Sequence, residues 1–315
     1  MDKKKLFITG HNGMVGSNLL NYFKKKYNCF TIDRAKLDLR NEEKLNLFLK
    51  KKKPDIIIHA AAKAGGIVSN SDEKIEMFME NTTIQNSLFR SAFNQKVKKI
   101  IFLGSSCIYP KNSKIPIKEE DLLNGKLEET NEGYALAKIS GVKLCQFFNK
   151  KYGTDFRAIM PCNLYGPNDH YNLSKGHVIP ALVKKFIDAK INNSKSVSIW
   201  GTGKPMREFL YTDDLSKSLE KIMNLSKLKY SKITNNNYLL NVGSEKNISI
   251  NQLAKKIKKI SNFNGKIIYK KNFPDGVYNK KLDCSKLKKI LKKINTTSLD
   301  DGLLKVINEY EASIL

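Results

Sequence analysis

The stretch KLFITGHNGMVGSNLL, residues 5–20, decides the fold of this chain. Its first residues form an apolar, β-branched run typical of a buried strand, and its last residues have the pattern of a helix. Gly10, Gly13 and Gly16 lie in the turn between them. Glycine permits a tight turn and a close backbone approach, and the start of a helix attracts phosphate. The stretch therefore predicts a loop that binds the pyrophosphate of a dinucleotide, with a simple packing turn as the alternative.

The same alternation of strand and helix continues through the first half of the chain. Further strand-like runs occupy 29–33, 55–62, 98–105 and 155–160, and helical patterns occupy 14–26, 42–52, 73–95 and 134–151. Nearly all-apolar strands that alternate with helices are typical of a parallel sheet covered on both faces. We therefore expect an α/β fold with a Rossmann-type, doubly wound parallel sheet.

The second half of the chain is less regular. Strand-like runs at 196–200, 238–243 and 266–270 are separated by helical segments and by loops rich in Gly, Pro and aromatic residues. This pattern predicts a smaller C-terminal α/β lobe that binds substrate. We place the dinucleotide-binding domain at residues 1–165, with segments near 210–245 packing back on it, and the substrate-binding domain at 166–315.

Composition limits the function further. The chain has 315 residues, 41% of them hydrophobic, and neither a signal-peptide pattern nor an apolar run of bilayer length. These features predict a cytoplasmic protein that does not enter a membrane. Five scattered cysteines without a C-x-x-C pair suggest neither a zinc site nor disulfides, so we expect no bound metal.

The formal net charge is +27, but it comes mainly from lysines spread over the expected surface helices. No nucleic-acid-binding motif accompanies the charge, so we interpret it as a solvated surface rather than a nucleic-acid site. A surface that binds polyanions remains an alternative.

The second strand ends at Asp33-Arg34. An acidic residue there binds the ribose 2′-hydroxyl of NAD, whereas arginine accommodates the 2′-phosphate of NADP. The two neighbours favour different cofactors, and the sequence leaves that choice open.

Two further motifs bring reactive groups into this framework. The run FLGSSCIYP, residues 102–110, ends an apolar strand in two hydroxyls and a thiol, at the edge where such sheets bind ligands. Tyr134 and Lys138 are four residues apart, one turn along a helix. A lysine cation beside a phenol favours the phenolate, so the pair predicts a tyrosine whose pKa is lowered for proton transfer.

Together these motifs resemble the extended short-chain dehydrogenase/reductase superfamily. The resemblance implies a Rossmann domain with a smaller substrate domain, and a catalytic set of Ser105, Tyr134 and Lys138. SSCIYP, HVIPAL and PMREFL narrow the resemblance to members that act on GDP-4-keto-6-deoxy-D-mannose. Those enzymes epimerise carbons 3 and 5 and then reduce carbon 4 with NADPH, which gives GDP-L-fucose.

The narrower resemblance also assigns a base and an acid. Cys107 matches the proposed base and His177 the proposed acid of the epimerisation. Taken alone, Cys107 would more often be a small buried apolar residue, and His177 could cap the following helix. A related nucleotide-sugar epimerase or dehydratase with tightly bound NAD is the nearest alternative, and a non-catalytic dinucleotide sensor is a second.

The remaining site residues follow from the same resemblance. The cofactor NADP(H) is expected to contact Gly10, His11, Asn12, Gly13, Met14, Val15, Gly16, Arg34, Leu103, Gly104, Ser105, Ser106, Lys138, Pro161, Cys162, Asn163, Leu164 and His177. The GDP-sugar is expected to contact Lys185, Trp200, Arg207, Lys266 and Asp275. Asn12 and Cys162 replace residue types common in the family. A homodimer joined by a four-helix bundle is implied, with 73–95 and 134–151 as its helices.

Overall fold

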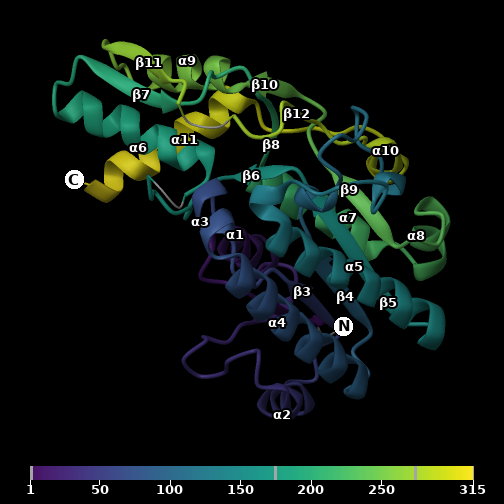
Figure 1. The fold of residues 1–315 in the computed structure, drawn as a ribbon. Coiled ribbons are helices and arrows are strands. Elements are labelled where there is room, and N and C mark those ends of the chain that lie inside the picture. The colour runs from purple at the N-terminus through teal and green to yellow at the C-terminus, as the bar shows by residue number, and fades with distance from the viewer. Residues whose placement is uncertain (1–2, 174–175, 273–274, 315) are drawn as a thin grey trace.

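A computed structural model describes residues 3–173, 176–272 and 275–314 (Figure 1). Its centre is a sheet of six parallel strands in the order β2-β1-β3-β4-β5-β9. These strands are β1 (Lys5–Thr9), β2 (Asn28–Phe30), β3 (Ile56–His59), β4 (Lys99–Leu103), β5 (Asp155–Pro161) and β9 (Leu239–Val242). The expected Rossmann-type parallel sheet is therefore confirmed.

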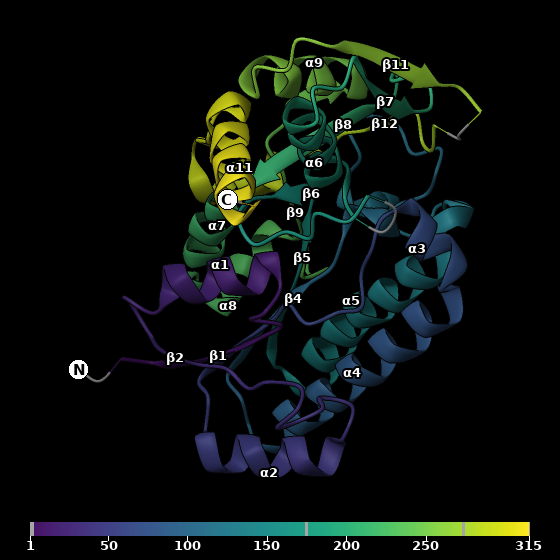
Figure 2. The same cartoon turned by 90° about the vertical axis from the view of Figure 1, so that its left-hand side faces the viewer.

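Helices cover both faces of this sheet, as Figure 2 shows. One face carries α1 (Met14–Phe23), α7 (Thr212–Asn224) and α8 (Lys227–Ile233). The other carries α2 (Glu42–Lys52), the short α3 (Ile67–Asp72), α4 (Lys74–Asn94) and α5 (Glu132–Tyr152). Because both faces are covered, strand residues such as Phe7, Ile57 and Ile101 are fully buried, which explains the nearly all-apolar strands.

A second core lies beyond the carboxyl edge of the central sheet. It contains α6 (Val178–Ile191), α9 (Ile250–Ile260) and α11 (Leu299–Ile314), with Phe186, Leu253 and Val306 among its buried residues. Its small sheets are formed by β6 (Asn163–Tyr165), β7 (Ser196–Trp200), β8 (Met206–Tyr211), β10 (Asn247–Ser249), β11 (Lys266–Lys270) and β12 (Asn279–Lys280). The remaining elements are α10 (Ser285–Leu291) and the 3₁₀ turns η1 (Ser106–Ile108), η2 (Glu119–Asp121) and η3 (Glu129–Asn131).

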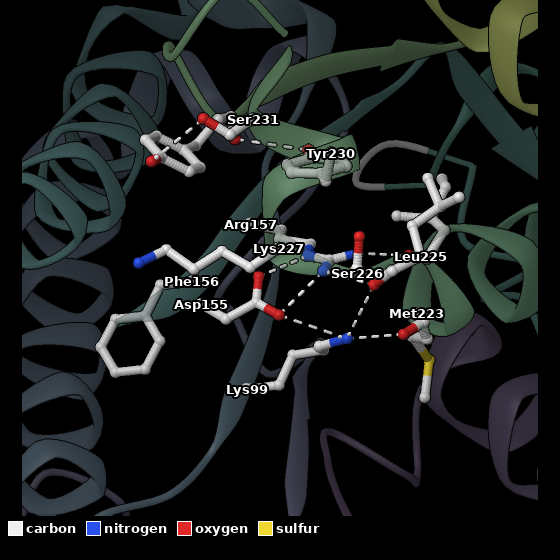
Figure 3. Close-up of polar contacts among 12 residues, drawn as sticks. Lys99, Asp155, Phe156, Arg157, Met223, Leu225, Ser226, Lys227, Tyr230 and Ser231 are labelled. Carbon is white, nitrogen blue, oxygen red and sulfur yellow. Dashed lines mark hydrogen bonds and ion pairs between the residues drawn. The ribbon is translucent and has the colours of Figure 1, made fainter. Parts of the chain in front are cut away.

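The chain returns to the first core after β8. Strand β9 pairs with β5, and α7 is held to the sheet by two cations, one each from β4 and β5 (Figure 3). Arg157 is fully buried, pairs with the Asp155 carboxylate and donates to the Leu225 carbonyl at 2.8 Å. Lys99 Nζ donates to the Met223 carbonyl at 2.6 Å. Cations at the carbonyl end of a helix satisfy groups that lack partners within the helix and interact favourably with its dipole.

Replacing Arg157 with methionine is expected to lower the free energy of unfolding by about 3 kcal/mol, because the mostly buried Asp155 carboxylate and the carbonyls at the end of α7 lose a fully buried donor. Urea denaturation measures the loss. Arg90→Met removes an arginine that is 62% exposed and pairs with Glu42, so it should cost under about 0.5 kcal/mol. Equal effects of the two variants would contradict a stabilising role for the buried cluster.

Within the described ranges, no helix is both long enough and apolar enough to cross a membrane.

Candidate active site

The glycine turn lies where the order of the central sheet reverses. Strand β1 has β2 on one side and β3 on the other, which is the point where such sheets bind ligands. Gly10 has φ +73°, and a Cβ there would lie 2.7 Å from the Ala61 nitrogen. A Cβ on Gly16 would lie 2.0 Å from the Gly10 carbonyl oxygen. Both positions therefore require glycine.

The amino end of α1 faces this turn. Gly13 is the N-cap residue of α1 and provides no side-chain cap, and a Cβ on it would meet only ordinary contacts. Amide groups at such a helix start bind phosphate oxygens. The turn thus fits the pyrophosphate of a dinucleotide.

A cavity of about 470 Å³ opens beside the glycine turn, between the two cores. It brings together most of the residues expected from the sequence: Met14, Val15, Leu103, Gly104, Ser105, Ser106, Cys107, Tyr134, Lys138, Pro161, Cys162, Asn163, Leu164, His177, Lys185, Trp200, Arg207 and Asp275. Six expected residues are not among its lining residues and belong to the glycine turn or to the segment after β2: Gly10, His11, Asn12, Gly13, Gly16 and Arg34.

Ser105 shapes the turn that presents Cys107. The Ser105 hydroxyl accepts a hydrogen bond from the Cys107 amide at 3.2 Å and caps η1. Cys107 is partly exposed and borders the cavity, whereas the other cysteines that border it or lie in the cores are buried. The polar end of the strand therefore holds the thiol at the cavity wall, and the interpretation of Cys107 as a buried apolar residue is wrong.

Tyr134 and Lys138 lie on one face of α5. Lys138 is buried, donates its Nζ to the Leu103 carbonyl at 2.9 Å and lies 5.6 Å from the centre of the Tyr134 ring. Burial lowers the pKa of Lys138 to about 8. Burial, and then the nearby Cys107, raise the pKa of Tyr134. The expected lowering of the Tyr134 pKa is therefore wrong for the free chain, because burial disfavours the charged phenolate.

His177 is the N-cap residue of α6, but its side chain makes no capping hydrogen bond. Its Nδ1 lies 3.6 Å from Oδ1 of the buried Asp169. Interaction with this carboxylate raises the pKa of His177, although burial partly opposes the effect. The imidazole is therefore kept protonated to a higher pH than usual, as suits an acid, and the capping alternative is wrong.

Cationic and aromatic side chains occupy the end of the cavity farther along the second core. Arg207 donates to the Val277 carbonyl at 2.7 Å, and its pKa is lowered by burial. Lys185 lies 5.1 Å from the centre of the Trp200 ring. Asp275 accepts hydrogen bonds from the amide and the hydroxyl of Thr202, each at 2.7 Å, and so joins two loops. Guanidinium, ammonium and indole groups suit a nucleoside diphosphate.

Lys266 was expected in this group but lies elsewhere. It is exposed at the start of β11, opposite Ser196, whereas Trp200 pairs with Lys270 at the far end of the same ladder. A strand is extended, so the four-residue separation from Lys270 takes Lys266 about 13 Å from that end. The sequence instead missed Lys280, Glu128 and Asn131, all of which border the cavity. No local motif singles them out.

Strand β2 ends at Phe30, before the expected strand end at Asp33, and in the segment that follows it Asp33 and Arg34 have different surroundings. The Asp33 carboxylate lies 3.2 Å from His11 Nε2 and 3.3 Å from Asn12 Nδ2. The Arg34 side chain is 67% exposed and reaches Glu80 at 3.5 Å. The Asp33 carboxylate is thus bound by side chains of the glycine turn, while the Arg34 guanidinium is largely exposed to solvent.

Replacing Arg34 with alanine is expected to raise KM for NADPH about 30-fold and leave KM for NADH within about twofold, since a charge-assisted hydrogen bond is lost only with the phosphorylated cofactor. Steady-state kinetics with both cofactors measures the change. Arg90→Ala, at an exposed position on α4, is the control. An equal rise in KM for NADPH and NADH would show that Arg34 does not bind the 2′-phosphate.

The fold and this site define a Rossmann-type enzyme that uses a nicotinamide dinucleotide. The profile of the NAD dependent epimerase/dehydratase family matches residues 6–236, and the chain belongs to that family.

Relatives with known names are similar over nearly the whole chain. A GDP-L-fucose synthase of Sinorhizobium fredii is 41% identical, covering 100% of this chain and 98% of its own. The Escherichia coli GDP-L-fucose synthase is 39% identical, covering 91% and 90%.

Solved structures give the same picture. A GDP-6-OMe-4-keto-L-xylo-heptose reductase from C. jejuni matches with a TM-score of 0.90 and 30% identity, over 99% of both chains. A GDP-L-fucose synthetase from Naegleria fowleri bound to NADP matches with a TM-score of 0.87 and 26% identity, over 100% of this chain and 96% of its own.

Proposed function

We propose that this chain is a GDP-L-fucose synthase that converts GDP-4-keto-6-deoxy-D-mannose to GDP-L-fucose with NADPH. The observation that carries the proposal is the meeting of Cys107, Tyr134 and His177 around one cavity that continues to Arg207. Two of these groups suit proton transfer on a sugar ring, and the phenol suits protonation of a reduced ketone. The named relatives at 39–41% identity support the same activity.

Epimerisation comes first in this scheme. Carbons 3 and 5 flank the carbonyl, so each C–H bond becomes acidic when donors stabilise the enolate oxygen. Ser105 and Tyr134 are the proposed donors to that oxygen. Cys107, as thiolate, removes the proton from one face of the ring, and His177 returns a proton to the opposite face. Each inversion leaves the ketone in place.

Reduction follows at carbon 4. Bound NADPH is the hydride source for this carbon. Tyr134 donates its proton to the alkoxide that forms, and the Lys138 cation stabilises the phenolate left behind. One oxygen-binding site therefore serves both half-reactions.

The experiment that tests the activity is product analysis. The purified chain is incubated with GDP-4-keto-6-deoxy-D-mannose and either NADPH or NADH, and the product is identified by NMR. GDP-L-fucose formed with NADPH is the expected product. The similarity to a GDP-heptose reductase favours a second candidate, reduction of carbon 4 without epimerisation. A product with unchanged carbons 3 and 5 would establish that candidate instead.

We also propose that the protein is cytoplasmic and that separate domains bind the cofactor and the substrate. Residues 1–165, with 210–245, form the NADP-binding domain, and 166–315 form the substrate-binding domain.

A homodimer through α4 and α5 completes the proposal. The two helices pack side by side, each has 21 residues, and each is about 31 Å long (Figure 2). Ile75 and Met79 on α4 are 70% and 61% exposed, and Leu136 and Phe147 on α5 are 41% and 62% exposed. Apolar side chains so placed on neighbouring helices suit a second copy of the same pair.

The double variant Ile75→Glu/Met79→Glu is expected to be monomeric at micromolar concentration, because four carboxylates would enter an apolar bundle. Size-exclusion chromatography with light scattering measures the mass. Leu228→Glu, at a position 82% exposed on α8, is the control and should stay dimeric. A monomeric parent chain would refute the dimer.

A further inference from the structure

Three buried side-chain oxygens that belong to residues lining the active-site cavity lack a hydrogen-bond donor among the described residues. They are Asn70 Oδ1, Glu128 Oε2 and Asn131 Oδ1. A buried acceptor without a donor loses its hydrogen bonds to water and forms none with the protein, which lowers the stability of the folded state. Few such groups occur in a folded protein, so three around one cavity call for an explanation in terms of a ligand.

Asn131 gives the clearest case. It occupies the N-cap position of α5, where an asparagine oxygen normally accepts a hydrogen bond from an amide of the first turn. Here the side chain makes no such bond, and its oxygen is buried. The side chain thus forgoes a stabilising local contact three residues before Tyr134.

Asn70 and Glu128 are held by other contacts. The amide nitrogen of Asn70 donates to the Gly65 carbonyl at 3.1 Å, so the orientation of the whole amide is fixed. Lys111 Nζ lies 3.6 Å from Glu128 Oε2, beyond hydrogen-bond length. The Glu128 charge also opposes the burial effect on the pKa of Arg207, so it lies near the proposed diphosphate anchor.

The three residues belong to one wall of the cavity. Asn70 is in α3, and Glu128 and Asn131 flank or lie in η3, against which α3 packs. In Figure 2, α3 lies at the end of α4 and α5 nearest the second core. The glycine turn and the residues from Pro161 to Leu164 belong to other elements, β1–α1 and β5–β6. The wall is therefore separate from the glycine turn and from the β5–β6 segment, although Asn131 caps the helix that carries Lys138.

We propose that Asn70, Glu128 and Asn131 form an acceptor wall that takes hydrogen bonds from the hydroxyl groups of the hexose in a GDP-sugar. This inference depends on one part of the proposed function, that the cavity binds a GDP-sugar, and it does not depend on which reaction follows. A hydroxyl is a donor, whereas phosphate and ketone oxygens offer only acceptors. The wall thus favours a hydroxyl-bearing sugar and disfavours a misplaced diphosphate, which gives it a part in specificity.

Calorimetry with GDP-mannose and GDP tests the wall without any turnover. In the NADP-saturated chain, Asn131→Leu is expected to weaken GDP-mannose binding about tenfold and leave GDP within about twofold. Asn131→Asp keeps an acceptor and should retain most of the affinity. Glu128→Met should repeat the effect of Asn131→Leu. Glu129→Gln, at the exposed neighbouring position, is the matched control and should change neither affinity.

Thermal unfolding gives a second readout. Asn131→Leu removes a buried oxygen that has no partner, and it breaks no capping hydrogen bond. The Tm of this variant should therefore equal or exceed that of the parent chain. A drop in Tm with equal losses for GDP and GDP-mannose would overturn the wall. Weaker NADP binding with unchanged GDP-mannose binding would assign the acceptors to the cofactor and overturn it as well.

The two proposals fail separately. If GDP-4-keto-6-deoxy-D-mannose is not converted but the variants still separate GDP-mannose from GDP, the acceptor wall stands and the proposed reaction is wrong. If GDP-L-fucose forms and the variants bind both ligands like the parent chain, the reaction stands and the wall is wrong.

Discussion

The Tyr134→Phe variant is expected to reduce the ketone about a thousandfold more slowly than the parent chain, since loss of a general acid costs two to four orders of magnitude. The reason is specific to this cavity. The phenol lines the cavity on the same helix face as Lys138, and desolvation raises its pKa, so it holds its proton at neutral pH until an alkoxide forms beside it. Phenylalanine fills the same space but supplies no proton.

Stopped-flow absorbance of NADPH under single-turnover conditions measures this step directly. The affinity for NADPH should stay within about threefold, because the Lys138–Leu103 hydrogen bond is untouched. Tyr152→Phe is the control on the same helix, at a side chain 49% exposed. A parent-like rate in Tyr134→Phe would assign the proton to another group, such as His177 or water.

The central sheet could be predicted because its sequence pattern has few interpretations. Runs such as KLFIT and the IIIH of β3 have consecutive buried apolar residues, Leu6–Ile8 and Ile56–Ile58, since helices cover both faces, and that pattern distinguishes a parallel sheet from an exposed one. The glycine turn could also be predicted from the sequence, because the crowded backbone at Gly10 and Gly16 excludes other residues. Local sequence determines local geometry in both cases.

The second core was harder to predict, because its site residues are brought together by pairings distant in sequence. Lys266 and Asp275 looked equally plausible, yet strand register puts the first away from the cavity and the Thr202 contacts hold the second at it. The buried oxygens of Glu128 and Asn131 have no pattern to mark them, since their character depends on lacking a partner in the folded chain. The Tyr134 pKa was missed for the same reason: burial is a property of the whole fold.

The Cys107→Ser variant is expected to lose at least about 100-fold in epimerisation while still reducing a ketone already inverted at carbons 3 and 5. A serine hydroxyl is far less acidic than a thiol, so it cannot serve as the base near neutral pH. The amide of residue 107 would still donate to Ser105 Oγ, so the turn that forms part of the oxygen-binding site is kept. The two half-reactions should therefore separate in this variant.

Deuterium exchange distinguishes the two steps. In deuterated water the parent chain should give a product labelled at carbons 3 and 5 but not at carbon 4, whose hydrogen comes from NADPH. Cys107→Ser should lose that labelling while keeping reduction of the epimerised ketone within about fivefold, as expected for a residue that acts in only one step. Cys29→Ser, at a cysteine outside the cavity lining, is the matched control. Equal loss of both steps would mean that Cys107 shapes the pocket rather than removing a proton, and a plain reductase would then describe the enzyme better.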